Sequence, residues 1–417
     1  MMRCRYLFTS ANKRLNLRRL NNVFSDHTCT ISSSNVCFAA DYLFGEYCQQ
    51  NHFQLFKRNL HIDSSKMGEL KRDFVKITEA KRFMVDCFVA SKTPKNHAEM
   101  MADLLVAADY RGHFSHGMNR LEMYLNDLHS GTTDGAAEPE VLKESPATAW
   151  VNGKNGLGAV VGNFCMHLAI KKAKTVGVGW VCANHSNHYG IAGWYAIQAQ
   201  KQGLIGMSMT NTSPVMCPTR AKSAALGTNP LSLAAPGENG DGMVLDMATT
   251  AKKMSIPYGW ALDKTGNVTT DAEDAFSASL LLPLGGMELT SGYKGYGLAA
   301  LVETLTGISA NAHFSTKVRK WSLDGSSHDE ANLGQVFIAV DPNCFAPGFE
   351  HRMTEMNDIL RNLPSVDEEK PVLVPGDPEK AHMKKVDEEG GITYHANQLK
   401  NCDELAARLN IPKLGSL

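Results

Sequence analysis

The sequence predicts a mixed protein of the α/β class with some α+β character, and three observations support this prediction. Between residues 146 and 341, short apolar runs alternate with helical patterns and are separated by turn residues. Helical patterns dominate both flanking parts of the chain. The composition is that of an ordinary folded protein, with 43% hydrophobic and 20% charged residues, which excludes a disordered or fibrous chain.

Three amphipathic helices are expected early in the patterned sequence, which begins at Met67. Thr78 is expected to cap the first helix, Thr93 and Pro94 to begin the second, and Gly131 to end the third. The residues expected to face a core recur at helical spacing: Ala80, Met84, Cys87 and Phe88; Ala98, Met101, Ala102 and Leu105; Leu121, Tyr124, Leu125 and Leu128.

The middle and the end of the chain are expected to alternate strands and helices. The expected strands are 147–151, 179–183, 204–211, 231–235, 243–247 and 335–340. The expected helices are 164–174, 295–307, 349–363 and a last helix near 402–409. The stretch between the last two helices reads as a charged, proline-containing tail.

The first 66 residues differ in charge from the rest of the chain, with nine basic and four acidic residues. Residues 1–25 are rich in arginine and contain no acid, which is typical of a mitochondrial transit peptide. If this segment does not act as a transit peptide, the expected compartment is the cytoplasm. The six cysteines after residue 66 form no CxxC pair, so reduced thiols are expected. A net charge of −1 argues against a dedicated nucleic-acid-binding protein, and the absence of a long apolar run argues against a membrane span.

The first candidate site is Ser115 and His116, followed by Arg120 and Tyr124. A helix starting near Ser115 would present its free N–H groups to an anion, with Arg120 and Tyr124 one and two turns further on. A guanidinium matches a carboxylate, and a neighbouring imidazole can exchange a proton with a hydroxyl. The alternative is that Ser115 only caps the helix and His116 is a polar surface residue.

The second candidate site is the polar segment 184–190, which follows an expected strand and contains His185 and His188. Its alternative is a solvated loop. The spacing of His113 and His116, or of Cys182 with the two later histidines, would also allow a metal. We expect none, because the second cluster has no carboxylate and the chain has no HExxH motif, but a metal-dependent hydrolase stays an alternative.

Two glycine-containing segments need a separate interpretation. Gly156, Gly158 and Gly162 follow a strand, but their GxGxxxG spacing and the lack of an acid after the next strand argue against a Rossmann fingerprint. We interpret them as packing or turn glycines. Lys294 and Gly295 open an expected helix, where a phosphate could bind or where the glycines could serve packing alone.

Taken together, these segments resemble the type-2 malate/L-lactate dehydrogenase family, which also contains ureidoglycolate and sulfolactate dehydrogenases. The resemblance covers about residue 70 to the C-terminus in the family's order. It rests on 111–117 with Arg120 and Tyr124, 187–193, 226–231, 245–250, 256–257, 259–261, 294–298, 334–335 and 374–376.

The resemblance implies hydride transfer between a 2-hydroxy acid, malate being the best expectation, and NAD, with NADP as the other possibility. It implies a non-Rossmann cofactor domain with a mixed, mostly antiparallel sheet flanked by helices, a helical dimerisation and substrate layer, and an interlocked homodimer. The expected division is an extension at 1–66, a helical domain of 67–140 with 337–417, and a cofactor domain at 141–336.

The resemblance also assigns site residues by motif. Ser115, His116 and Arg120 would form the substrate site, with His188 as a second active-site histidine; either imidazole could exchange the hydroxyl proton. The expected cofactor contacts are Thr212, Asp246, Met247, Ala248, Lys294, Pro375 and Gly376.

One segment departs from the family's pattern. Residues 251–255 connect two family motifs with roughly ten residues fewer than the family's members have. The shortened segment follows an expected cofactor strand, so an inactive family member is a further alternative, beside a sister dehydrogenase acting on ureidoglycolate, sulfolactate or lactate.

Overall fold

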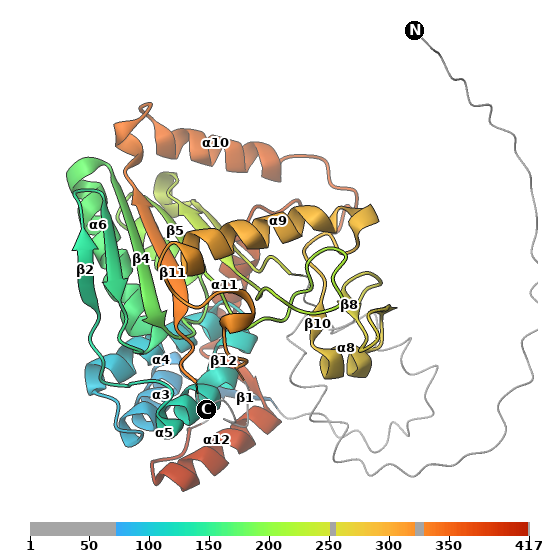
Figure 1. Cartoon of the computed structure of the whole chain (residues 1–417). Coiled ribbons are helices and arrows are strands. Elements are labelled where there is room, and N and C mark those ends of the chain that lie inside the picture. Colours follow the sequence, from blue (N-terminus) through green and yellow to red (C-terminus); the bar gives the residue numbers. More distant parts are fainter. Residues whose placement is uncertain (1–71, 251–255, 322–328, 416–417) are drawn as a thin grey trace, which may run out of the picture. The chain divides into compact units, whose positions relative to one another are not determined.

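The computed structural model describes residues 72–250, 256–321 and 329–415 (Figure 1). The expectations for the extension at 1–66 and for the shortened segment at 251–255 lie outside the described residues. Within the described ranges, no helix is long and apolar enough to cross a membrane. The six cysteines there are free thiols.

A seven-stranded sheet forms the centre of the fold, in the order β2-β3-β4-β11-β5-β6-β7. Every neighbouring pair is antiparallel except β3 and β4, which helix α6 (Gly158–Val176) connects. The expected mixed, mostly antiparallel sheet is therefore confirmed. The strands are β2 (Glu140–Glu144), β3 (Thr148–Asn152), β4 (Val178–Ser186), β5 (Ile205–Thr210), β6 (Leu231–Ala235), β7 (Met243–Met247) and β11 (Leu333–Val340).

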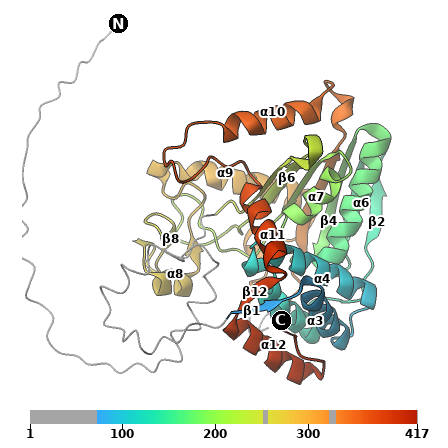
Figure 2. The same ribbon diagram turned by 180° about the vertical axis from the view of Figure 1, so that it is seen from behind.

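Helices cover both faces of this sheet. Helices α6 and α7 (Gly193–Gln200) lie on the face seen in Figure 2, and α9 (Gly292–Glu303) with the π-helical turn Thr304–Ile308 lies on the other. The central strand β11 shows the two-residue period that this arrangement requires. Phe337 packs with the α6 and α7 side, whereas Val336 packs on the α9 side.

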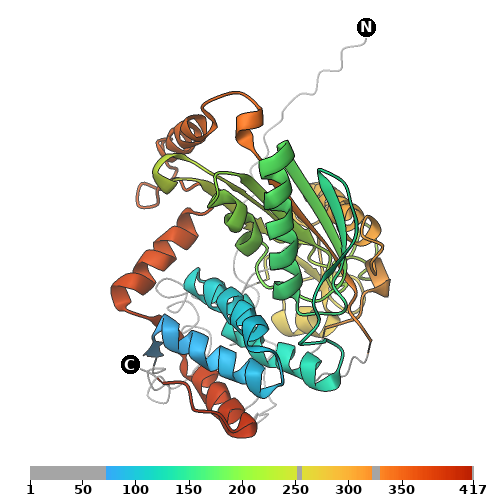
Figure 3. The ribbon, with the colours of Figure 1, turned by 90° about the vertical axis from the view of Figure 1, so that its left-hand side faces the viewer.

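A helical layer packs beside the sheet and joins both ends of the described chain (Figure 3). Its members are α3 (Ile77–Ala90), α4 (Lys95–Tyr110), α5 (Leu121–Ser130), α11 (Asp377–Glu389), α12 (Ala396–Leu409) and the strand pair β1 (Arg72–Val75) and β12 (Ile392–His395). The predicted apolar faces of the first three helices are confirmed, because these residues are buried in one core apart from the half-buried Leu128. Gly131 ends α5 in the left-handed conformation, as expected.

Several predicted boundaries were wrong. Helix α3 begins at Ile77, so Thr78 lies inside its first turn and makes no cap; α4 begins at Lys95, after Pro94. No helix starts near Ser115, where the chain forms the 3₁₀ turns Phe114–His116 and Met118–Arg120 before α5. The predicted tail contains α11, whose Pro378 occupies the first turn, where a missing N–H costs nothing.

The remaining elements lie outside these two layers. A three-stranded sheet of β8 (Ala261–Leu262), β9 (Val268–Thr269) and β10 (Leu280–Leu281) packs with α8 (Ala272–Ala278). Helix α10 (Phe349–Arg361) contacts the 3₁₀ turn Glu238–Gly240. Three further 3₁₀ turns are Glu288–Thr290, Ser315–Lys317 and Pro342–Cys344.

The glycines at the start of α6 are packing residues, as predicted. A side chain at Gly158 would collide with the carbonyl oxygen of His188, and one at Gly162 would collide with the ring of Tyr195. That ring stacks on Tyr189 with centroids 4.8 Å apart, deep in the core between α6 and the sheet. The glycines therefore let α6 approach the segment that follows β4.

Gly162→Ala should destabilise the protein by about 1–3 kcal/mol, because the buried tyrosine pair cannot yield to the new methyl group without leaving its rotamers. The matched control is Gly297→Ala in α9, where a Cβ meets no atom within 4 Å. Replacing a helical glycine in open space should stabilise by roughly 0.5–1 kcal/mol. Thermal and urea unfolding would measure both; equal destabilisation by the two variants would contradict the packing role of Gly162.

Candidate functional site

Three of the predicted site residues, His116, Arg120 and His188, line a cavity of about 320 Å³. The imidazole rings of His116 and His188 stack with centroids 5.9 Å apart and an interplanar angle of 22°. The predicted cofactor residue Thr212 lines the same cavity. Two side chains that the sequence did not single out, Arg319 and Trp321, complete its polar end; the rest of the lining is mainly apolar.

The segment with the two 3₁₀ turns carries His116 and Arg120 and is internally bonded. The Ser115 hydroxyl lies 2.9 Å from Nδ1 of His116, so it can orient that ring. Nε of Arg120 donates to the carbonyl oxygen of Ser115 at 2.8 Å. The alternative, in which Ser115 caps a helix and His116 is only a polar surface residue, was therefore wrong: Ser115 caps no helix, and His116 lines a cavity.

Asp109, in the last turn of α4, anchors this segment from beneath. Its fully buried Oδ2 accepts the backbone N–H of Met118 at 2.9 Å and the Tyr394 hydroxyl at 2.7 Å. Any side chain at Gly117 would collide with this carboxyl group, which explains the glycine. Burial raises the pKa of Asp109 to about 7, although both hydrogen bonds act in the opposite direction.

His188 follows the end of β4, and its tautomer is defined by its neighbours. The Tyr124 hydroxyl lies 2.6 Å from Nδ1 of His188, and the backbone N–H of Gly190 points at the same atom from 3.3 Å. Because the Gly190 N–H can only donate, Nδ1 acts as an acceptor and the Tyr124 hydroxyl donates in this bond; burial raises the pKa of Tyr124, so the phenol keeps its proton. Because Nδ1 accepts, the neutral imidazole carries its proton on Nε2.

A buried carboxylate, Glu303 of α9, holds the loops that line the other side of the cavity. It accepts hydrogen bonds from the side-chain amides of Asn211, at 3.0 Å, and Asn229, at 2.6 Å. Thr212 follows the first amide, and Thr228 precedes the second; the Thr228 backbone N–H donates to the Thr212 hydroxyl at 2.9 Å. The network fixes Thr212 and Thr228 at the cavity wall.

A second cavity, of about 160 Å³, contains two of the predicted cofactor residues, Asp246 and Gly376. The backbone N–H of Gly193 donates to Oδ2 of Asp246 at 2.7 Å, yet burial raises the pKa of this carboxyl to about 6. The cavity's charged lining also includes Arg111, His113, Glu379 and Lys380. The Nε2 atom of His113 lies 3.4 Å from Glu379, which lowers the pKa of that carboxyl.

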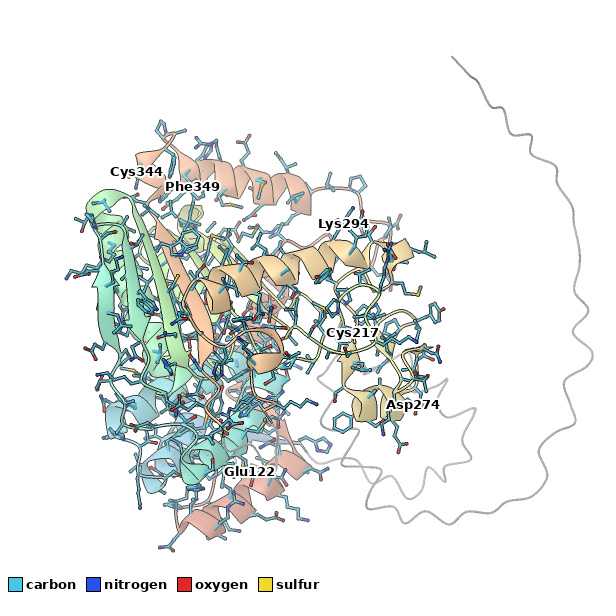
Figure 4. All side chains as sticks on the ribbon, in the orientation of Figure 1. Glu122, Cys217, Asp274, Lys294, Cys344 and Phe349 are labelled. Atoms are coloured by element: carbon cyan, nitrogen blue, oxygen red, sulfur yellow. The ribbon has the colours of Figure 1, made fainter. Side chains whose placement is uncertain are left out.

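Four predicted cofactor residues line neither cavity. Met247 is the last residue of β7, and Ala248 follows it. The carbonyl oxygen of Pro375, which precedes Gly376, accepts the backbone N–H of Val244 at 3.0 Å. Lys294 is exposed in the first turn of α9, where Figure 4 labels it, and its ammonium lies 6.0 Å from the ring centroid of Tyr293. Within the described residues of a single chain, Lys294 therefore does not join the imidazoles.

The histidines weighed as metal ligands do not converge in the described residues. No group of three histidine, cysteine, aspartate or glutamate side chains there has the arrangement of a metal site. His113 faces Glu379, and His185 faces Glu330 at 3.4 Å, whereas His116 and His188 line the larger cavity.

Comparison with known proteins identifies a family and related folds. A model of the malate/L-lactate dehydrogenase family matches residues 75–402. The malate dehydrogenase of Pyrococcus horikoshii is 36% identical over 364 residues, which cover 83% of this chain and 99% of that protein; its solved structure superposes with a TM-score of 0.77. The L-sulfolactate dehydrogenase of Methanocaldococcus jannaschii is 38% identical over 346 residues, covering 79% of this chain and 96% of that protein.

The fold and these matches define a 2-hydroxy-acid dehydrogenase, an oxidoreductase. More particularly, the chain belongs to the malate/L-lactate dehydrogenase family, as its sequence motifs predict.

Asp109→Asn should change how stability depends on pH. The pKa of the Asp109 carboxyl is raised from 3.8 to about 7 by folding, so its proton stabilises the native state at low pH, and this contribution is lost as the pH rises through about 7. Asparagine keeps an acceptor for Met118 and Tyr394 without titrating. The melting temperature of the wild type minus that of the variant should therefore fall between pH 5 and pH 8.

The matched control is Asp103→Asn, which makes the same substitution at a carboxyl that is 43% exposed beside Lys81, outside the site. A difference for Asp109→Asn that changes with pH no more than the difference for Asp103→Asn would show that the Asp109 carboxyl does not titrate with folding.

Proposed function

We propose that the protein interconverts a 2-hydroxy acid and its 2-oxo acid with a nicotinamide dinucleotide, and that malate and NAD are the preferred pair. The observation that carries this proposal is the stacking of His116 and His188 in one cavity with Arg120. An acid with a neighbouring hydroxyl needs one cation for the carboxylate and one imidazole for the hydroxyl proton. The names of the malate and L-sulfolactate dehydrogenases above support the substrate class.

In this proposal each side chain has a separate task. Arg120, held by the Ser115 carbonyl, binds the substrate carboxylate and so orients C2. His188, with Nδ1 accepting from Tyr124, presents an Nε2 proton as a hydrogen-bond donor to the C2 oxygen. His116 can change its protonation without losing Ser115, because a hydroxyl both donates and accepts. When bound, the nicotinamide would supply or accept the hydride at C2.

The residues present fit such a cofactor. The second cavity offers two cations, Arg111 and Lys380, which suit a pyrophosphate, and the desolvated carboxyl of Asp246, which suits a ribose hydroxyl. Two chain segments line both cavities, 111–120 and 188–193. We therefore propose that a dinucleotide would extend between the cavities, with Thr212 near its nicotinamide end; the roles of Met247, Ala248, Lys294 and Pro375 stay part of the proposal.

We also propose that the protein works as a homodimer. Large apolar side chains are exposed on one face at the end of α10 and just beyond it, with Met356, Ile359 and Leu363 each roughly half exposed, and burial against a second copy would remove them from water. The proposed division of labour assigns substrate binding and dimerisation to the helical domain and the cofactor to the sheet domain. The proposed compartment is the cytoplasm, with mitochondrial import if residues 1–25 act as a transit peptide.

A substrate panel tests the proposal directly. Purified full-length protein should reduce NAD with malate faster than with sulfolactate, ureidoglycolate or lactate, and faster than it reduces NADP. Activity should persist in excess chelator, which a metal-dependent hydrolase could not achieve. No turnover with any acid, together with no rise in melting temperature on adding NADH or NADPH, would instead support the inactive alternative.

Three variants separate the proposed roles. His116→Gln and His188→Gln should each lower kcat by about 10²–10⁴-fold, because each removes a group that handles the substrate proton or oxygen. Arg120→Lys should mainly raise KM for the acid, since an ammonium cannot bind a carboxylate in two parallel hydrogen bonds. Cofactor dissociation constants, measured by fluorescence titration, should stay within about threefold of the wild type; unchanged kcat in a histidine variant would remove that residue from the mechanism.

A further inference from the structure

Trp321 lies beside three groups of the site: His188, its partner Tyr124, and Arg120. Its ring centroid lies 4.4 Å from that of His188, at an interplanar angle of 31°, and 5.3 Å from that of Tyr124. The guanidinium carbon of Arg120 lies 5.7 Å from the indole centroid, within range of a cation–π interaction. One half-buried indole therefore contacts the imidazole, its phenolic partner and the guanidinium.

Two hydrogen bonds fix the position of this indole. The indole N–H donates to Oδ2 of Asp127 at 2.9 Å, and the backbone N–H of Trp321 donates to the Ser213 hydroxyl at 3.1 Å. That hydroxyl in turn donates to the carbonyl oxygen of Arg319 at 2.7 Å. Because Asp127 lies three residues after Tyr124 on α5, the helix that carries the His188 partner also holds the indole.

Arg319 balances the charge of Asp127 inside the protein. Its Nη2 lies 2.6 Å from Oδ2 of Asp127 and its Nη1 3.3 Å from Oδ1, and the two side chains are only 5% and 9% exposed. Desolvation makes a buried ion pair a poor source of stability compared with apolar packing. Holding the Trp321 indole in place would explain why this ion pair is buried beside the cavity.

We propose that Trp321, held by the Asp127–Arg319 ion pair, is a positioning residue that sets the orientation of His188 relative to Arg120. The inference rests on the proposed function, because that function assigns binding of the C2 oxygen to His188 and carboxylate binding to Arg120. The indole packs against the imidazole and leaves Nδ1 to Tyr124, so the ring keeps one orientation while substrate enters. Without this contact, the imidazole can rotate away from the oxygen that it serves.

The main experiment is a double-mutant cycle on full-length protein with the fastest acid of the panel. Trp321→Leu should lower kcat by about 10–100-fold, the scale expected when a catalytic group is displaced by about 1 Å. Trp321→Phe keeps an aromatic ring but loses the hydrogen bond to Asp127, so kcat should fall by a smaller factor. In a His188→Gln background, Trp321→Leu should lower kcat by less than about threefold, because the group that it positions is absent.

The matched control is Trp150→Phe, which also removes one indole hydrogen bond, at 2.8 Å to the carbonyl oxygen of Ala310, but lies outside the cavity lining. It should leave kcat and KM unchanged, even if the melting temperature falls as it does in Trp321→Phe. A loss of kcat in Trp150→Phe equal to that in Trp321→Phe would reduce the role of Trp321 to general stability.

A measurement that does not depend on catalysis separates the positioning role of Trp321 from the proposed function of His188. With ¹³C-labelled histidine, the His188 ring signal, identified by its loss in His188→Gln, should shift in Trp321→Leu because the indole ring current is gone. The inference would be overturned if Trp321→Leu lowered kcat by the same factor in the wild type and in His188→Gln, or if the His188 ring signal did not shift. Full activity of His188→Gln itself would instead overturn the proposed function. Unchanged kcat in Trp321→Phe would remove Asp127 from the positioning role.

Discussion

The site depends on a carboxylate that never faces it. The segment from Phe114 to Arg120 has no regular helix of its own, so its backbone must be bonded to something else. Asp109 supplies that partner and at the same time binds Tyr394, which lies in β12 near the other end of the chain. His116 and Arg120 thereby take their positions from a carboxyl group that also joins this segment to the C-terminal part of the described chain.

The second half of the site is built in the same manner from the sheet. His188 lies where β4 ends, and Gly158 allows α6 to pack directly against its backbone. The contacts between the halves are Tyr124, which bonds to His188, and the pair of Asp127 with Arg319. Displacing the helical layer from the sheet would therefore separate the imidazoles before it altered either loop.

Sequence patterns were sufficient for residues that lie in short motifs or in periodic elements. His116, Arg120 and His188 belong to recognisable segments, and the strands 231–235 and 243–247 were predicted with their observed bounds. Asp109 also left a signal, because it is a carboxylate directly after the apolar run 104–108. Asp127, Arg319 and Trp321 were missed because their contacts join positions 192 and 194 residues apart, and no local pattern encodes such a contact. The prediction of a helix at Ser115 was wrong because the Asp109 side chain, rather than a helical hydrogen bond, accepts the Met118 N–H, and the segment forms two 3₁₀ turns.

A pocket proposed to bind an acid is thus held in place largely by acids, and an uncompensated carboxylate there would repel the substrate. Each anchor is neutralised in a different way. Asp127 is paired with Arg319, Glu303 is surrounded by amide and backbone N–H donors, and burial raises the pKa of Asp109 enough to keep much of it protonated near pH 7. The proton of Asp109 can occupy Oδ1, which is buried without a hydrogen-bond partner, so both anchoring bonds to Oδ2 survive protonation. The carboxyl groups of Asp109, Asp127 and Glu303 can therefore hold the walls of the cavity in place while adding little uncompensated negative charge to it.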